Sequence, residues 1–286
     1  MNARPSFLSH RRKPWFKLPP GTCDAHCHVF GPAVKFPYAP NRRYTPEDAP
    51  KEMLAALHAH LGIERAVIVQ ASCHGTDNAA MLDCIASDPD RYRGVAIVND
   101  DFTDADFDKL DDGGVRGVRF NFVKHLGGAP DMAVFNRVID RIKGRGWHVV
   151  LHVDAPDIIP LSEMMRNLPL PFIIDHMGRV PAAGGVDQPP LRALIELSRL
   201  EKCWIKVCGS ERISMPPYAE AVPIAHALVE AAPDRVLWGT DFPHPNATHE
   251  ADEADLVDLV PQFAPDPLAQ KRLLVDNPAA LYGFGS

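Results

Sequence analysis

The sequence predicts a (β/α)8 barrel, a closed ring of eight parallel strands with helices outside. Short apolar runs alternate with helical patterns along most of the chain, which is typical of parallel strands joined by crossover helices. The length of 286 residues suits one such barrel, a fold that commonly needs about 250 residues. A doubly wound open sheet is the alternative. No Gly-x-Gly-x-x-Gly motif follows any expected strand, so a dinucleotide-binding sheet has little support.

The elements follow from the spacing of apolar residues. Each expected strand is a short run rich in Val, Ile and aromatic residues, and each expected helix repeats apolar residues at three- and four-residue intervals. The strands are expected at residues 22–30, 65–72, 92–99, 116–122, 147–154, 171–178, 203–209 and 235–244. The helices are expected at residues 51–61, 78–87, 104–111, 133–144, 158–167, 191–200, 218–231 and 268–281, the last with a bend at Asn277-Pro278.

Two segments lie outside this alternation. Residues 1–21 are rich in Arg, Lys and Pro and too poor in apolar residues for a core element, so we expect an irregular N-terminal arm before a single barrel domain at 22–286. Residues 31–50 hold five prolines together with Phe36, Tyr38 and Tyr44. That composition predicts a long ordered loop over the mouth of a site.

Composition excludes several classes of partner. The formal charge of −7 and 46% hydrophobic content indicate a globular protein that does not generally bind nucleic acid or an anionic membrane. No apolar run approaches the roughly 20 residues of a membrane span, and the first 21 residues contain no hydrophobic signal core. The expected location is therefore cytoplasmic.

The six cysteines lack CxxC spacing, which favours reduced thiols over disulfides.

Chemically active side chains recur at the ends of the expected strands. In a barrel the loops after the strands share one face, so such residues converge there. They are His26, His28, Ser72, His74, Arg119, Asn121, His152, Asp154, Asp175, His176, Ser210, Arg212 and Asp241. Each alone has a structural explanation, such as a helix cap or a core histidine.

His26 and His28 lie on one face of a strand because side chains alternate. Together with Asp241 they would suit a divalent metal.

Five segments carry a resemblance to a known family. They are residues 24–31, 69–78, 116–122, 174–179 and 239–246. Together they resemble the amidohydrolase superfamily and, within it, the 2-pyrone-4,6-dicarboxylate lactonase group. The similarity runs from about residue 21 to residue 282 and implies the same barrel fold.

The resemblance implies a reaction and its catalytic groups. The expected activity is hydrolysis of a carboxylated lactone, 2-pyrone-4,6-dicarboxylate or a close analogue, in aromatic-compound degradation. Asp241 is expected to activate water, and His26, His28 and His176 to polarise the lactone carbonyl. Because the departing ring oxygen is enolic, no metal is expected to be required. An adventitious or structural zinc ion would be held by His26, His28 and Asp241.

The resemblance also implies substrate contacts. Arg119 and Arg212 are expected to bind carboxylates bidentately. Further candidates are Tyr44, Ser72, His74, Arg179, His244 and Asn246. Two positions depart from the group: His125 stands where it typically has arginine, and His152 where it has tyrosine. The expected partner is a small anionic lactone, and the expected assembly is a monomer or small homo-oligomer.

Two other functions remain open. A metal-dependent decarboxylase would use His26, His28, His176 and Asp241 around zinc, and it would need stoichiometric metal. A non-catalytic barrel would bind small acids without turnover. Metal analysis distinguishes the first alternative, and a turnover assay distinguishes the second.

Overall fold

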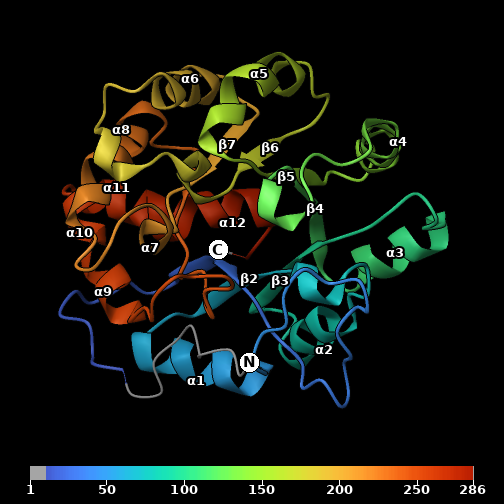
Figure 1. The fold of residues 1–286 in the computed structure, drawn as a ribbon. Helices are drawn as coiled ribbons and strands as arrows, with labels where there is room; N and C mark the ends of the chain where they lie inside the picture. The colour runs from blue at the N-terminus through green and yellow to red at the C-terminus, as the bar shows by residue number, and fades with distance from the viewer. Residues whose placement is uncertain (1–10, 286) are drawn as a thin grey trace.

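The computed structural model of the chain describes residues 11–285 and forms the expected barrel (Figure 1). One eight-stranded parallel sheet runs in sequence order from β1 to β8. The strands are β1 Cys23–Cys27, β2 Arg65–Val69, β3 Tyr92–Ala96, β4 Val115–Asn121, β5 His148–His152, β6 Phe172–Ile174, β7 Cys203–Lys206 and β8 Val236–Leu237. All eight lie within the expected runs apart from the first residue of β4, but most are shorter. The open-sheet alternative is therefore wrong.

Backbone hydrogen bonds between β1 and the segment after β8 close the ring. Ala25 N donates to Trp238 O over 2.8 Å, and Asp241 N donates to His26 O over 2.7 Å. His28 N then donates to Phe242 O over 2.8 Å. The segment that follows β8 is thus hydrogen-bonded directly to the first strand and the residue after it.

Helices surround the strands in Figure 1. Those matching the expectation are α1 Lys51–Leu61, α2 Ala79–Ser87, α3 Asp104–Asp112, α4 Met132–Ile142, α5 Ala155–Arg166, α6 Pro189–Ser198 and α8 Val222–Ala231. Short helices that the pattern did not predict are α7 Ser210–Ile213, α9 Glu253–Asp258 and α10 Val260–Phe263. The expected closing helix consists of α11 Pro267–Lys271, the π-helical segment η6 Arg272–Asp276 and α12 Asn277–Tyr282. The expected bend is replaced by this π-helical segment, and Asn277 keeps helical angles.

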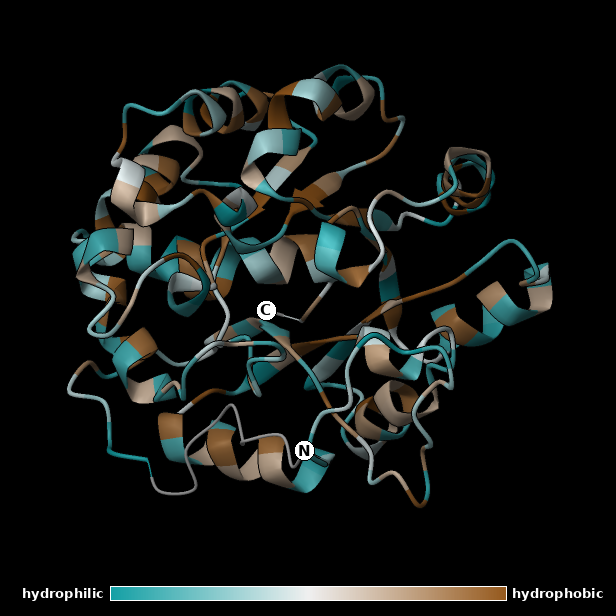
Figure 2. Ribbon diagram, viewed as in Figure 1, coloured by the Kyte–Doolittle hydropathy of each residue, from teal (hydrophilic) through white to brown (hydrophobic). Residues whose placement is uncertain are grey.

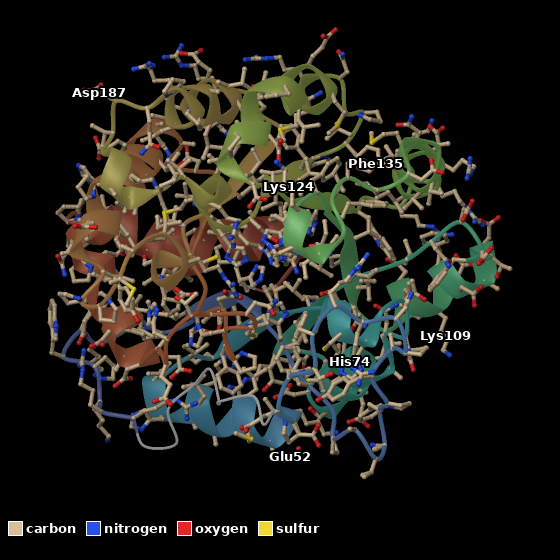
Figure 3. All side chains as sticks on the ribbon, in the orientation of Figure 1. Glu52, His74, Lys109, Lys124, Phe135 and Asp187 are labelled. Carbon is tan, nitrogen blue, oxygen red and sulfur yellow. The ribbon has the colours of Figure 1, made fainter. Side chains whose placement is uncertain are left out.

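Two apolar layers hold the barrel. The outer layer packs helices on strands, as where Phe135 of α4 meets Phe120 of β4 with ring centroids 4.8 Å apart (Figure 3). The inner layer fills the barrel and includes Val67, Val150 and Ile173, with Tyr282 and Phe284 packed against them. Figure 2 shows the strands largely in the hydrophobic colour, whereas the helices alternate between hydrophobic and hydrophilic residues.

The described part of the arm is irregular, as expected. Arg12 pairs with Asp255 and Asp258 of α9 at 2.6 Å each. The part of the arm at residues 1–10 lies outside the described residues. All six cysteines are buried and free, and within residues 11–285 no helix has the length and apolar character needed to span a bilayer.

Candidate active site

The join between β1 and β8 brings Asp241 beside His26. A Cβ on Gly239 would lie 2.6 Å from His26 N, so only glycine lets the two segments approach this closely. Below the site, Asp24 Oδ1 accepts hydrogen bonds from the backbone N–H groups of His26 and Thr240. These contacts lock Asp241 to the first strand.

The register of β1 shifts around His26, one of the two histidines that enter the site, and His28 follows the end of the strand. The pairing with β2 slips between Asp24 and Cys27, which marks a bulge or irregularity in the strand, and such features re-aim side chains. His26 and His28 then lie together, with ring centroids 5.0 Å apart. His176 joins them from the end of β6, its ring 4.6 Å from that of His26. The predicted convergence of the three imidazoles is therefore present.

Asp241 is completely buried at the centre of this group. Arg212 Nε donates to its Oδ2, and Oδ1 lies 3.3 Å from His28 Nε2 and 3.6 Å from His26 Nε2. Burial opposes ionisation of Asp241, but the charge of Arg212 opposes burial, and the pKa of Asp241 is held well below the ordinary value. Asp241 is therefore a carboxylate at neutral pH. Its backbone φ of 60° is in the left-handed region, which is rare for a residue with a side chain.

The contacts of His28 define which of its nitrogens carries hydrogen. Nδ1 lies 2.8 Å from Val69 O, and because a carbonyl only accepts, Nδ1 donates. In the neutral ring Nε2 is then an acceptor facing Asp241 Oδ1. That arrangement suits a proton shared between His28 and Asp241.

A second buried charge cluster lies beside His26, and sequence reasoning missed its role. Asp175 Oδ2 accepts from Arg119 Nε at 2.9 Å, and Asp175 Oδ1 lies 3.3 Å from Lys206 Nζ. Burial opposes ionisation of Asp175, but Lys206, His26 and Arg119 outweigh it and lower its pKa well below the ordinary value. The sequence feature that could have indicated this cluster is a lysine inside the apolar run 203–209.

Several predicted substrate-binding residues do lie around the same centre. His152 packs against His176 with ring centroids 5.2 Å apart and against His125 at 6.3 Å. Burial and the charges of Arg179, Arg212 and Arg119 lower the pKa of His125, so its ring is neutral at neutral pH. Tyr44 and Arg179 also lie near this centre. The Tyr44 side chain hydrogen-bonds to Ser72, and the charge of Arg119 acts on its pKa. Arg179 donates to Asp154 over 2.9 Å.

Three predicted residues are placed elsewhere. His74 (Figure 3) uses both ring nitrogens on the loop 31–50, accepting from Gly31 N and contacting Pro37 O. His244 is buried between Glu211 and Glu253, 3.4 Å and 3.3 Å away. Burial opposes protonation of His244, but these two carboxylates outweigh it and raise its pKa to about 10. Asn246 is exposed. We therefore assign none of these three to substrate contact.

Three sets of side chains in the described part of the chain could hold a metal, and one of them includes the histidines of this site. His26, His176 and Asp241 place one ligand atom each within 4.8 Å of one another, which differs from the expected set in replacing His28 by His176. Two imidazoles and a carboxylate are ligands that zinc accepts. The surrounding charges oppose a resident ion, because three cations, Arg119, Lys206 and Arg212, already pair with the carboxylates of Asp175, Asp241 and Glu211. The site as built does not suit an added divalent charge.

A family model described as amidohydrolase matches residues 23–284, nearly the whole chain. The chain belongs to the amidohydrolase family. Two relatives show which members of that family the chain resembles. A 2-pyrone-4,6-dicarboxylate hydrolase from Comamonas testosteroni is 46% identical over 94% of this chain and 92% of its own length. A 4-sulfomuconolactone hydrolase from Hydrogenophaga intermedia is 41% identical over 94% and 90%.

A solved structure extends the comparison with this amidohydrolase. A Pseudomonas putida protein assigned as a 2-pyrone-4,6-dicarboxylic acid hydrolase is 34% identical. It superposes with a TM-score of 0.83, covering 94% of this chain and all of that one. The similarity therefore spans the barrel and every strand end that contributes to the site.

Proposed function

We propose that this amidohydrolase is a lactonase that hydrolyses a small anionic lactone, 2-pyrone-4,6-dicarboxylate or a close analogue, in aromatic-compound degradation. The observation that carries the proposal is the meeting of Asp241 with His26 in a buried site that also holds Arg119 and Arg212. The two lactone hydrolases named above, similar over more than nine-tenths of the chain, support it.

Asp241 is the group that takes the proton from water. Its Oδ2 is held by Arg212, so Oδ1 is the oxygen that receives the proton. The protonated Oδ1 then donates to His28 Nε2, the acceptor 3.3 Å away. This bond stabilises the protonated form, which offsets the weak basicity of a carboxylate with a lowered pKa.

Hydrogen-bond donors for the lactone carbonyl lie beside Asp241. His26 Nε2 is buried and has no hydrogen-bond partner within residues 11–285, and His176 lies beside it. We assign these two rings to the oxyanion that forms when hydroxide adds to the carbonyl carbon. The bond from that carbon to the ring oxygen then breaks, and the ring oxygen takes the proton from Asp241.

Arginines at the mouth bind the negative substituents of the substrate. Arg119 donates from Nε to Asp175. Among the described residues no hydrogen bond from its two terminal nitrogens is found, so these nitrogens are available to donate to a carboxylate. Arg212 is committed to Asp241 and to Pro245 O at 2.9 Å. Arg212 therefore acts mainly on the base, and Arg119 and Arg179 are the principal carboxylate contacts.

Replacing His125 with arginine is expected to strengthen binding of a dicarboxylate at pH 8. The neutral His125 ring offers no charge there, whereas the guanidinium pairs with the second carboxylate. We expect KM to fall about tenfold, equivalent to about 1.4 kcal/mol, with kcat unchanged. Steady-state kinetics measures this, and a lactone with one carboxylate is the control substrate. An equal gain on both substrates would show that His125 does not face the second carboxylate.

Removal of metal is expected to leave the activity unchanged. The cations Lys206 and Arg212 already neutralise the two carboxylates of the site, so no ion is needed for that purpose. The protein is dialysed against a chelator, its zinc content is measured by mass spectrometry, and turnover is followed before and after. Loss of turnover that added zinc restores would instead support a metal mechanism.

A lactone panel followed by proton release tests the function itself. Lactones with and without a second carboxylate are supplied, and ring opening releases one proton for each turnover. Release of carbon dioxide would favour the decarboxylase, and binding without proton release would favour the binding barrel. Either outcome would overturn the lactonase proposal.

A further inference from the structure

One buried cation has no part in the reaction described above. Lys206 is completely buried at the end of β7. Trp204 packs with the inner layer whereas Cys203 and Ile205 pack with the outer layer, so the alternation of the strand points Lys206 into the barrel. Burying an ammonium group is expensive unless its neighbours compensate. The burial of Lys206 therefore needs a physical explanation.

The contacts of Lys206 converge on one nitrogen of His26. Lys206 Nζ lies 3.0 Å from His26 Nδ1 and 3.3 Å from Asp175 Oδ1. An ammonium group has three N–H donors and no acceptor. His26 Nδ1 is therefore an acceptor in this contact, and the hydrogen of the neutral ring belongs on Nε2. Burial and the charge of Lys206 lower the pKa of His26 to about 3, which keeps the ring neutral.

We propose that Lys206 is a positioning residue that sets the tautomer of His26, so that the nitrogen facing Asp241 is an N–H donor. Without the ammonium, the nearest polar neighbour of Nδ1 is Asp175 Oδ1 at 3.3 Å. A carboxylate only accepts, so Nδ1 would take the hydrogen. Nε2, 3.6 Å from Asp241 Oδ1, would then present a lone pair to the reaction centre.

The tautomer decides what kind of chemistry His26 supports. An Nε2–H donates to an oxyanion, whereas an Nε2 lone pair is a metal ligand that would join His176 and Asp241. Lys206 thus favours hydrogen-bond catalysis over metal binding in the same set of side chains. The catalytic part of this inference rests on the proposed lactone hydrolysis, but the tautomer does not.

The tautomer is measured directly in the full chain without substrate. Long-range proton–nitrogen NMR correlations distinguish Nε2–H from Nδ1–H in a neutral imidazole, and the His26→Gln variant assigns the signal. We expect Nε2–H in the wild type and Nδ1–H in Lys206→Met. An Nδ1–H tautomer in the wild type overturns the proposal even if no variant folds. Lys202→Met, which removes a lysine just before the same strand, is the matched control.

Kinetics and zinc binding provide the second readout. In Lys206→Met we expect kcat on the lactone to fall about 10²–10³-fold, as for loss of one oxyanion donor, with KM little changed. Zinc affinity, measured by equilibrium dialysis, should rise in this variant and not in Lys202→Met. Lys206→Gln keeps an N–H donor and should recover part of kcat. A Lys206→Met protein that retains Nε2–H and full kcat would refute the proposal. If the wild type opens no lactone, the proposed function fails while the NMR result still decides the tautomer.

Discussion

Asp241→Asn is expected to abolish lactone hydrolysis while leaving the barrel folded. The amide keeps the shape of the carboxylate but takes no proton from water, and loss of a general base costs about 10²–10⁴-fold in kcat. The substitution also removes the nearer of two buried carboxylates that face Arg212 and leaves only Glu211, 3.8 Å away. Removal of one member of a buried pair costs on the order of 3 kcal/mol of folding free energy. Proton-release kinetics and thermal unfolding measure the two effects separately.

Asp154→Asn is the matched control for that variant. Asp154 also pairs with an arginine, Arg179 at 2.9 Å, but both side chains are about one-quarter exposed on the rim. We expect little loss of stability, because a partly exposed pair is screened by solvent, and no loss of the water-activating base. If Asp241→Asn and Asp154→Asn reduced kcat equally, Asp241 would not be the base.

The fold was predictable because its signals are local. The helix at Lys51–Leu61 matches the expectation at both ends, since buried leucines at helical spacing are followed by Gly62 in a left-handed C-cap with φ of 84°. Strand positions were predictable for the same reason. Strand lengths were not, because pairing with neighbours ends β6 after three residues and β8 after two.

The site was predictable in part. Residues at strand ends converge by topology, so His26, His176 and Asp241 were found. The side-chain contacts of a residue could not be predicted where the backbone turns sharply. Asp241 and His244 have φ values of 60° and 57°, and between them the chain turns so that His244 is buried against Glu211 and Glu253 rather than at the substrate. Lys206 was missed because which face of a strand points inward is known only once the barrel has closed.

Arg212→Met is expected to move the acid limb of the pH–rate profile to higher pH. The ionised form of Asp241 is the active base, so activity is present above its pKa and lost below it. Arg212 is the largest influence that lowers this pKa, and its removal weakens the opposition to burial, which raises the pKa. An adjacent arginine typically lowers a carboxyl pKa by about 1–3 units. The acid limb of kcat/KM should therefore rise by a similar amount.

The stability of the same variant should depend on pH with a definite sign. In the wild type the lowered pKa of Asp241 contributes stability above the ordinary carboxyl pKa, and that contribution is lost as pH falls through the folded pKa. In Arg212→Met the buried carboxylate is unpaired, so protonating it relieves the penalty. The difference in melting temperature between wild type and variant should then shrink from pH 7 to pH 5. Arg179→Met removes a substrate contact and the pair with Asp154, so it should lower kcat/KM without moving the acid limb and without the pH-dependent difference in melting temperature. An acid limb that stays in place in Arg212→Met would mean that the guanidinium does not control the base.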